Sequence, residues 1–315
     1  MRTAAVTQCG GDTMGTSWSV RIAGSLHEEA IAAVHAVLAL VIDQMSNWET
    51  TSAISILNRT PPGTWLTMPA AFLHVLRAGL DVASRSGGAF DPTIGESVDA
   101  WGFGPSGLRV TPPDHIPPAS PGWRAIEVQG ERVRRTAAVA LDFSGIAKGY
   151  AVDAVTEALA ARGIRHALVE IGGELRGMGV RPDGQPWWVD VETPPGLSLP
   201  VTRVALCGLS IATSGDYRRW FAAGGKRFSH SIDPRTGAPI TNNVASVSVL
   251  HASAMLADAW ATAIAVLGPR EGLLLAARER LAVLMVTREG ENGAREWMSP
   301  ALADMLDAPV SSDLD

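Results

Sequence analysis

Apolar residues recur every three or four positions in several stretches of the chain, a spacing that places them on one face of a helix. The first stretch follows Ser25-Leu-His-Glu28, which has the form of a capping box. The third ends before Gly163, a residue suited to the C-terminus of a helix. The expected helices run from Ile31 to Met45, from near Pro69 to Gly87, and over Lys148–Arg162, Ser253–Leu267 and Pro269–Arg280.

Three shorter segments have the composition of strands, namely His166–Ile171, Trp187–Glu192 and Val244–Leu250. Proline-rich stretches at Pro105–Pro121 and Thr193–Pro200 are expected to be loops. The order of helices and strands lacks the regular alternation of βαβ units, and no internal repeat is found. The pattern therefore predicts an α+β fold.

Composition limits the possible functions. The chain has 315 residues, of which 46% are hydrophobic and 18% charged, with a mean hydropathy of +0.13. These values favour a large buried core over disorder. A formal net charge of -6 and a pI near 5.7 argue against a nucleic-acid-binding protein. A phosphorylated substrate would need its charge met locally, by a metal or by helix N-termini.

No apolar run reaches the roughly 20 residues that a transmembrane helix needs. The segment Met1–Gly11 carries Arg2 but no apolar stretch after it, so it does not have the form of a signal peptide. The cysteines, Cys9 and Cys207, match neither a metal-ligand spacing nor a disulfide framework. We expect a cytoplasmic protein without a transmembrane segment.

The common nucleotide and zinc motifs are absent. No G-x-G-x-x-G follows a strand, and Gly225-Lys226 is followed by Arg227, so there is no P-loop. No H-E-x-x-H occurs, and the seven histidines are scattered, which disfavours a zinc hydrolase.

Polar clusters rich in Gly, Pro and Thr lie where the predicted elements end. Met14-Gly15-Thr16 is explained equally well by a strand that begins after a glycine turn. In Gly87–Gly95, glycine permits close approach of a ligand, and Asp91 and Thr93 can hydrogen-bond an adenine or a ribose. An Asp-Pro turn after a helix explains the same residues, and the segment alone favours that interpretation.

The segment Asp142–Asp153 joins a strand to the third predicted helix. Free N–H groups and the positive dipole end of a helix N-terminus suit a pyrophosphate, and Lys148 adds a mobile positive charge there. An N-cap Asp or Ser beside a solvated lysine explains these residues equally well.

Three later features complete the candidate chemistry. Ala212–Arg219 is a polar turn with many hydroxyls, and His230–Gly237 has the composition of a tight turn, where a lone histidine is usually structural. Asp258 and Thr262 lie four positions apart on one helical face, and two such hard oxygen ligands suit Mg2+. A buried polar contact is the alternative, although an unpaired buried Asp is costly.

Taken in order, these segments resemble the ApbE family, the FAD:protein FMN transferases, from about Met14 to Gly268. The resemblance implies an ApbE-like, T-fold-related mixed sheet with packed helices. It also implies a tail over 1–13, one FAD-binding catalytic domain over 14–307 that can divide into two closely packed lobes, and a tail over 308–315. The most specific matches are Phe90-Asp-Pro-Thr, Trp101-Gly-Phe-Gly, Gly145-Ile-Ala-Lys-Gly-Tyr-Ala-Val-Asp153, Ile171-Gly-Gly-Glu, Ala212-Thr-Ser-Gly-Asp-Tyr, His230-Ser-Ile-Asp-Pro-Arg-Thr-Gly and Ala257-Asp-Ala-Trp-Ala-Thr262.

The resemblance also implies site residues. Mg2+ would be held by Asp258, Thr262 and the carbonyl of Gly145, with the carbonyl of Ala261 as a further candidate. His230 occupies the position of a histidine proposed to take part in transfer. The implied FAD contacts are Met14, Trp48, Ala89, Phe90, Asp91, Asp142, Lys148 and Ile232.

Three positions depart from the family pattern. Ser52-Ala-Ile54 lacks the acid that is often found there, Trp48 stands where Tyr is common, and Glu174 replaces the more usual Asp after Gly-Gly. An indole keeps a stacking surface but not the hydroxyl of Tyr. These departures concern the details of flavin binding.

The implied reaction is Mg2+-dependent. Mg2+ and Lys148 would neutralise the pyrophosphate of FAD while a Ser or Thr hydroxyl of a target flavoprotein attacks the FMN-side phosphorus and AMP leaves. His230 or Asp258 would receive the hydroxyl proton, and an ordinary histidine pKa near 6.5 favours His230 over a metal-bound Asp258. Two alternatives are a Mg2+-dependent FAD pyrophosphatase, which would use water and release FMN and AMP, and a non-catalytic FAD-binding protein.

Overall fold

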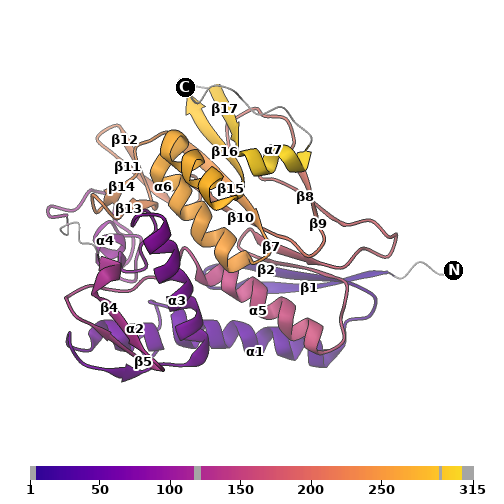
Figure 1. Cartoon of the computed structure of the whole chain (residues 1–315), viewed down its shortest axis with the longest axis horizontal. Coiled ribbons are helices and arrows are strands. Elements are labelled where there is room, and N and C mark those ends of the chain that lie inside the picture. The colour runs from indigo at the N-terminus through magenta and orange to yellow at the C-terminus, as the bar shows by residue number, and fades with distance from the viewer. Residues whose placement is uncertain (1–4, 117–121, 291–292, 307–315) are drawn as a thin grey trace.

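The computed structural model describes residues 5–116, 122–290 and 293–306. Its main feature is an eight-stranded sheet in which every neighbouring pair is antiparallel (Figure 1). The strands follow one another across the sheet in chain order, so β1 and β17, from the two ends of the chain, form its opposite edges. The strands, in spatial order, are β1 Val6–Thr13, β2 Thr16–Ala23, β6 Ala167–Ile171, β7 Glu174–Met178, β10 Ser210–Gly215, β15 Val244–His251, β16 Ala282–Glu289 and β17 Gly293–Met298.

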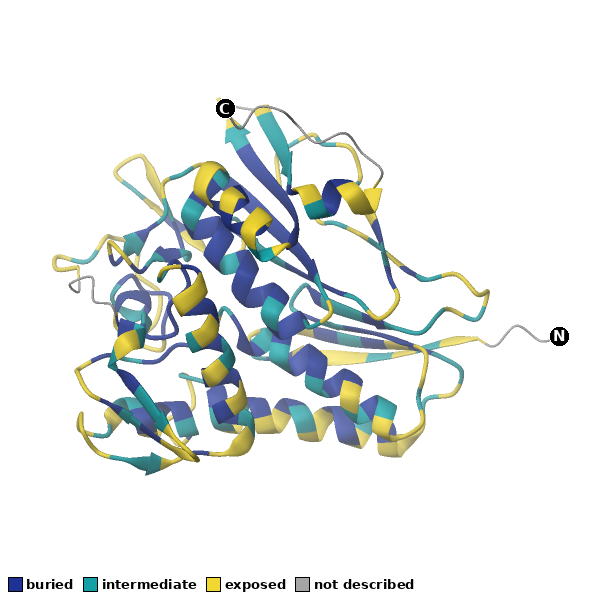
Figure 2. Ribbon diagram, in the orientation of Figure 1, coloured by how far each residue is buried: buried dark blue, intermediate teal, exposed yellow. Residues whose placement is uncertain are grey.

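Helices cover one face of this sheet. Helices α5 (Ala147–Ala161) and α6 (Ala254–Glu279) pack directly on the strands, and α1 (Glu28–Met45) packs against α5. Side chains of the three helices and of the facing strand positions form one large apolar core, and the buried, dark-blue segments in Figure 2 recur along these helices and the strands that they cover. The other helices are α2 Ala53–Arg59, α3 Ala70–Arg85, α4 Gly95–Ala100, α7 Pro300–Leu306 and the 3-10 turn Gly122–Ala125.

The opposite face of the sheet has a smaller cover. Strands β8 (Trp187–Asp190) and β9 (Arg203–Leu206) form a separate antiparallel pair, and α7 packs beside it (Figure 1). A second apolar cluster lies beneath them, with Trp187, Leu206 and Leu302 facing strand residues such as Leu168 and Ile211. Because strand side chains alternate between faces, the sheet is buried against two different layers.

Three small sheets surround α4 and the loops around it. They are β3 (Leu66–Thr67), β5 (Arg132–Arg135) and β4 (Ile126–Gln129); β11 (Trp220–Ala223) and β12 (Lys226–Ser229); and β13 (Ile232–Asp233) and β14 (Ala238–Pro239). Trp101, Phe103, Phe221 and Ile232 form a third apolar cluster here. The rings of Trp101 and Phe228 stack with their centroids 5.3 Å apart, so this cluster fixes the loops that carry residues 94–104 and 220–239.

The predicted helices are confirmed, with one correction at an end. The first begins at Glu28, but its N-cap is His27 and no side chain caps it, so the predicted capping box at Ser25 is wrong. Two acidic residues in the first turn stabilise the free N–H groups instead. The two late helices are confirmed as separate helices on either side of Gly268, whose φ of 78° interrupts the helical backbone before Pro269; both carry the label α6.

The predicted α+β class and the predicted strands are confirmed, as β6, β8 and β15. The expected tail over 1–13 is wrong for Val6–Thr13, because this segment pairs along its whole length with β2 as strand β1. Its inward-facing residues are Thr7, Cys9, Gly11 and Thr13, which include no large apolar side chain, so the apolar alternation that marks a half-buried strand is missing from the sequence. The expected tail over 308–315 lies outside the described residues.

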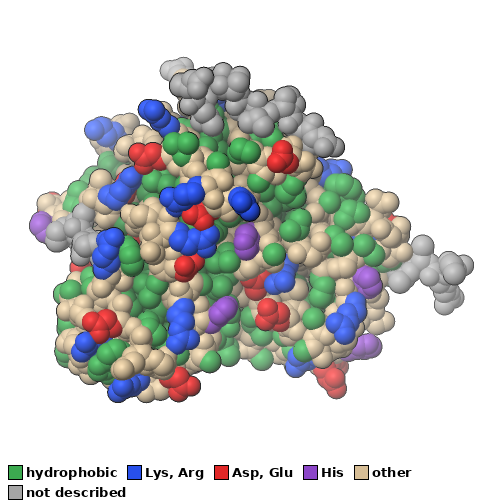
Figure 3. Space-filling model, in the orientation of Figure 1, with side chains coloured by type: hydrophobic (Ala, Val, Ile, Leu, Met, Phe, Trp, Pro, Cys, Tyr) green, Lys and Arg blue, Asp and Glu red, His purple; other side chains and the backbone are tan. Residues whose placement is uncertain are grey.

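Positive and negative side chains alternate over the face of the molecule in Figure 3, and no extended basic patch is visible on it. Cys9 and Cys207 are both unpaired, as predicted. Within the described residues, no helix has the length and apolar composition needed to cross a bilayer.

Candidate functional site

Asp258 lies in the second turn of α6, where it is 3% exposed. Its Oδ2 accepts a hydrogen bond from the backbone N–H of Gly149, in the first turn of α5, at 3.1 Å. A side chain at position 149 would collide with the carbonyl of Ala254, so only glycine lets the two helix backbones approach this closely. The glycine therefore brings a buried carboxylate against the N-terminus of α5.

Thr262 follows Asp258 one helical turn later, as the spacing predicted. Its Oγ1 lies 3.2 Å from the Oγ of Ser214 on β10, and a Cβ added to Gly145 would lie 3.0 Å from the same Oγ1. The structure thus brings Gly145 together with Asp258 and Thr262, from two segments that are more than a hundred residues apart in the sequence. Ala261, the further candidate ligand, is fully buried in the main core.

Lys148 forms an ion pair with Glu174, whose side chain is 2% exposed. Burial lowers the pKa of Lys148, but the negative charges of Asp258 and Glu174 outweigh that effect, and the pKa is raised. Burial raises the pKa of Asp258, against the opposing effect of Lys148. The same burial raises the pKa of Glu174 to about 7.

Two buried carboxylates therefore share one lysine. The Oε2 of Glu174 is fully buried and has no hydrogen-bond partner among the described residues. A buried unpaired acceptor is costly, and an excess of negative charge in a low dielectric is more so. The cluster is consequently short of one positive charge, and this deficit is the main electrostatic feature of the site.

The donor set fits a hard divalent cation. A carboxylate from Asp258, a hydroxyl from Thr262 and the carbonyl of Gly145 are all oxygen ligands of the kind that Mg2+ takes, and Mg2+ usually completes its shell with water and phosphate oxygens. Within the described part of the chain, no three His, Cys, Asp or Glu side chains gather as a metal-binding group. The ligand set predicted from the sequence is of another kind, because it has a single carboxylate together with a hydroxyl and a carbonyl oxygen.

Asp142 joins the loop before α5 to the segment around Trp48. Its Oδ1 accepts from the backbone N–H of Ser144 at 2.8 Å, and its Oδ2 accepts from the Nδ2 of Asn47 at 3.2 Å. Its own backbone N–H donates to the carbonyl of Pro92 at 2.8 Å. Three loops, around residues 47, 92 and 142, are therefore held together next to the predicted metal ligands.

Asp91 is buried and engaged within its own loop. It accepts from the backbone N–H and the hydroxyl of Thr93, at 2.8 and 2.6 Å, and from the backbone N–H of Trp123 at 3.3 Å. These contacts agree with the interpretation of this segment as an Asp-Pro turn after a helix. Ala89 and Phe90 are also buried, and the Phe90 ring would lie 3.4 Å from a Cβ at Gly145, so the loop borders the candidate metal site.

Met14 lies in the tight turn between β1 and β2, with a left-handed backbone at φ 48°. The next strand residue, Thr16, approaches Gly172, since a Cβ at position 172 would lie 3.0 Å from the Thr16 Cγ2 and 3.2 Å from the Lys148 Cδ. The turn that carries Met14 is therefore close to the lysine, although the two segments are separated by more than a hundred residues.

His230 is half-buried beside Arg219. Its Nδ1 lies 3.1 Å from the Arg219 carbonyl, which can only accept, so Nδ1 carries the proton and Nε2 keeps a free lone pair. Burial lowers the pKa of His230 to about 4, so the ordinary value near 6.5 assumed from the sequence is wrong for this site. The imidazole is neutral at pH 7.

Trp48 stands on the other side of Arg219. Its side chain is 49% exposed, and the Arg219 guanidinium lies 5.9 Å from its ring centroid. Arg219 also lies 6.0 Å from the ring of Phe103, which packs edge-on against His230. Ile232 is buried in the aromatic cluster with Phe103. Arg219 thus connects Trp48, which is an exposed aromatic surface, with the neighbourhood of His230, which is a neutral base.

Sequence reasoning did not single out Ser214, Arg219 or Glu174 for these contacts. All three lie in the segments Ile171–Glu174 and Ala212–Arg219, but the composition of these segments assigns no role to an individual residue. Asp153, quoted only as the end of a motif, ties α5 to the start of α6 by accepting from the backbone N–H of Ala254 and Met255, both at 3.0 Å. Only the folded geometry identifies these partners.

The chain is similar to known proteins over most of its length. Residues 14–285 match the family model described as the ApbE family. A Klebsiella pneumoniae protein named FAD:protein FMN transferase is 33% identical, over 94% of this chain and 88% of that protein. The apo crystal structure of the flavinyl transferase ApbE from Pseudomonas stutzeri superposes with a TM-score of 0.87 at 36% identity, covering 97% of this chain and 98% of that one. A mutant of the Vibrio cholerae flavin transferase ApbE superposes with a TM-score of 0.85 at 32% identity, over 96% and 99% of the two chains.

Proposed function

The chain belongs to the ApbE family, and we propose that it transfers the FMN half of FAD to a Ser or Thr hydroxyl of a target flavoprotein and releases AMP. The observation that carries this proposal is that Gly145, Asp258 and Thr262 meet beside Lys148. The cluster lacks one positive charge, because two buried carboxylates share a single lysine. A pyrophosphate is doubly anionic, so its binding requires the positive charge that this site lacks.

The residues present fit a resident Mg2+, held by Asp258, Thr262 and the carbonyl of Gly145, with the Ala261 carbonyl as a further candidate. Bound there, the ion supplies positive charge to the pyrophosphate oxygens. Lys148 adds a second charge from the first turn of α5. Glu174 holds the ammonium group of Lys148 in place through their ion pair.

The flavin half is proposed to lie between Trp48 and the loops that carry Met14, Ala89, Phe90, Asp91, Asp142 and Ile232. Trp48 offers an exposed indole face for stacking. In the transfer, a bond forms between the acceptor oxygen and the FMN phosphorus, and the bond from that phosphorus to the bridging oxygen breaks, so AMP leaves with that oxygen. The hydroxyl proton passes to the free Nε2 of His230.

Incubation of the protein with FAD, Mg2+ and a peptide that carries Asp-Gly-x-Thr, of the Asp-Gly-x-Ser/Thr acceptor type that goes with the family resemblance, tests this function. We expect covalent flavin fluorescence on the peptide and an equal amount of AMP. AMP with free FMN and no labelled peptide would indicate a pyrophosphatase, and intact FAD after long incubation would indicate a flavin-binding protein without catalysis. The Asp258→Asn variant is expected to lose transfer, and full activity of that variant in Mg2+ would contradict the metal assignment.

The cytoplasmic location expected from the sequence stays a prediction, and cell fractionation with an antibody to the protein tests it.

A further inference from the structure

A cavity opens on the face of the large sheet opposite to Asp258. Leu168 and Ile211 line it, and both belong to the apolar cluster beneath β8 and β9. Their chain neighbours Val169 and Ala212 point the other way, into the core under α5 and α6. The cavity measures about 830 Å³, counting the space at its open mouth. We call it the β8 groove.

One wall of the β8 groove is the edge of a strand. Five consecutive residues line it, from Trp188 to Glu192; the first three belong to β8, and the last two follow it in extended backbone that still bonds beside β9 at Val191. Side chains of consecutive strand residues point to opposite faces, so a cavity that touches all of them lies along the strand's edge. The opposite wall is the open face of the large sheet, formed by Arg21, Glu170 and Thr213 together with the apolar residues already named.

The backbone of this edge is unpaired. Strand β8 pairs with β9 on its other side, and the Val191 N–H donates to the Thr202 carbonyl at 2.8 Å. In an antiparallel ladder every second residue bonds the partner strand, so the N–H and C=O groups of Trp188 and Asp190 point away from β9. Among the described residues, these backbone groups form no hydrogen bond. Free edges of this kind are templates for another extended chain.

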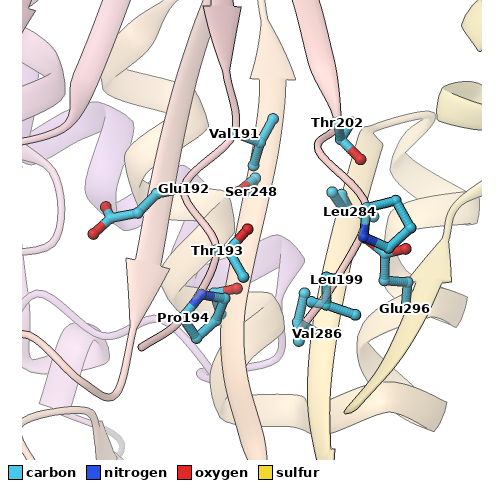
Figure 4. A pocket seen from close by; sticks show the side chains of 12 residues that line it. Val191, Glu192, Thr193, Pro194, Leu199, Thr202, Ser248, Leu284, Val286 and Glu296 are labelled. Atoms are coloured by element: carbon cyan, nitrogen blue, oxygen red, sulfur yellow. The ribbon is translucent and has the colours of Figure 1, made fainter. Parts of the chain in front are cut away.

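The β8 groove reaches the catalytic residues at one end. Gly173 and Arg218 both line it. Gly173 follows Gly172, where an added Cβ would lie 3.2 Å from the Lys148 Cδ, and a Cβ added to Gly173 would lie 2.7 Å from a guanidinium nitrogen of Arg218. Arg218 pairs with Glu192 at the end of the strand. Figure 4 shows the Glu192 carboxylate pointing away from the small cavity beneath Thr193 and Leu199, consistent with this pairing.

We propose that the β8 groove binds the acceptor segment of the target protein as an added strand on β8, which leads its hydroxyl toward Lys148. This inference rests on the proposed transfer to a protein. An extended polypeptide is the ligand that satisfies alternating free N–H and C=O groups while it places every second side chain on the sheet face. The indole of Trp188, 46% exposed at the groove, adds an aromatic contact.

The binding test uses a fluorescein-labelled peptide of about twelve residues with Asp-Gly-Ala-Thr at its centre, titrated without FAD and followed by anisotropy. The variant pair is Asp190→Pro and Asp190→Ala. Both lose the ion pair with Arg203, but only proline removes the outward N–H, and edge strands tolerate proline there. We expect Asp190→Pro to bind the peptide about three- to tenfold more weakly than Asp190→Ala, the effect of one hydrogen bond.

A second measurement leaves the protein unchanged, so it does not depend on whether the proline variant folds. Peptides with a single N-methyl group on successive backbone nitrogens are titrated against the wild-type protein. Strand addition predicts that affinity falls at every second position. Equal effects at neighbouring positions, equal binding by the two Asp190 variants with intact folds, or no saturable binding to the wild type would each overturn the docking proposal.

Addition of FAD and Mg2+ separates this inference from the proposed function. If the peptide binds with the alternating pattern but gains no covalent flavin, transfer to a Ser or Thr hydroxyl fails and the docking groove stands. If covalent flavin forms on the peptide without the alternating pattern, the transfer stands and the groove is wrong.

Discussion

The carboxylate of Asp153 on α5 accepts a hydrogen bond from the backbone N–H of Ala254, the first residue of α6, at 3.0 Å. The same carboxylate accepts from the Met255 N–H at 3.0 Å and the Ser253 hydroxyl at 2.7 Å, and it pairs with Arg176 at 2.6 Å. A side chain on one helix thus satisfies the free N–H groups at the start of the other. This contact links the helix that carries Lys148 to the helix that carries Asp258.

Removal of this carboxylate should be strongly destabilising. In Asp153→Ala, two N–H groups at the start of α6 and the Arg176 charge lose their partner, a situation that costs about 3 kcal/mol or more when buried. Urea unfolding measures the loss. The matched control is Asp183→Ala, whose carboxylate is half-exposed and 3.7 Å from Arg181, and which should change stability by less than about 0.5 kcal/mol. Equal stabilities of the two variants would contradict the role of Asp153.

The electrostatic deficit at Asp258 and Glu174 predicts a response to metal. Mg2+ at about 100 times its dissociation constant should stabilise the wild-type protein by roughly 2.7 kcal/mol, seen as a higher melting temperature. Asp258→Asn removes the proposed ligand and one of the two buried carboxylates, so its melting temperature should not depend on Mg2+. Asp183→Asn changes an exposed carboxylate and should keep the full response. A Mg2+ response in Asp258→Asn equal to that of the wild type would exclude this metal site.

Gly145 is expected to be essential for the shape of the same site. In Gly145→Ala, the new methyl group lies 3.0 Å from the Thr262 Oγ1 and 3.4 Å from the Phe90 ring, so Thr262 must shift. We expect at least a tenfold loss of apparent Mg2+ affinity in the AMP-release assay, with a small change in unfolding free energy. Gly79→Ala is the control, since its methyl group meets Phe90 and Pro92 at ordinary contact distance inside α3. That substitution should stabilise the helix by up to about 1 kcal/mol and leave the Mg2+ dependence unchanged. An unaltered Mg2+ dependence in Gly145→Ala would argue against its carbonyl as a ligand.

Helices with a clear apolar period could be predicted from the sequence, and so could the strands that read as continuous apolar runs. Helix α5 and strand β15 belong to these groups, and their boundaries differ from expectation by only one residue. Strand β1 was missed because most of its residues are exposed, and strands β9, β11 and β12 were missed because each has only four residues and mixes buried with exposed positions. Such strands carry little local signal.

At the site, the spacing of Asp258 and Thr262 predicts their shared face, because a helix fixes residues four positions apart. No periodicity connects either residue with Gly145 or Glu174, which reach α6 through the packing of α5 and β7. The lowered pKa of His230 was equally out of reach, since it depends on how deeply the folded loops bury the ring. The family resemblance supplied these associations, and the fold gives them a physical cause.

His230 should make stability depend on pH in a defined range. Burial lowers the pKa of its imidazole to about 4, whereas the unfolded chain binds a proton near pH 6.5. Between these values only the unfolded state is protonated, so stability is complete above pH 6.5 and falls as the pH decreases toward 4. Between pH 7.5 and pH 4.5, the free energy of unfolding of the wild-type protein should fall by about 2 to 3 kcal/mol more than that of His230→Gln. Urea unfolding of both proteins at the two pH values measures this difference, and other titrating groups, such as His251, cancel in it. Equal losses in the two proteins would show that the imidazole titrates normally in the folded state, and the transfer rate would then fall below pH 6.5 if His230 is the base.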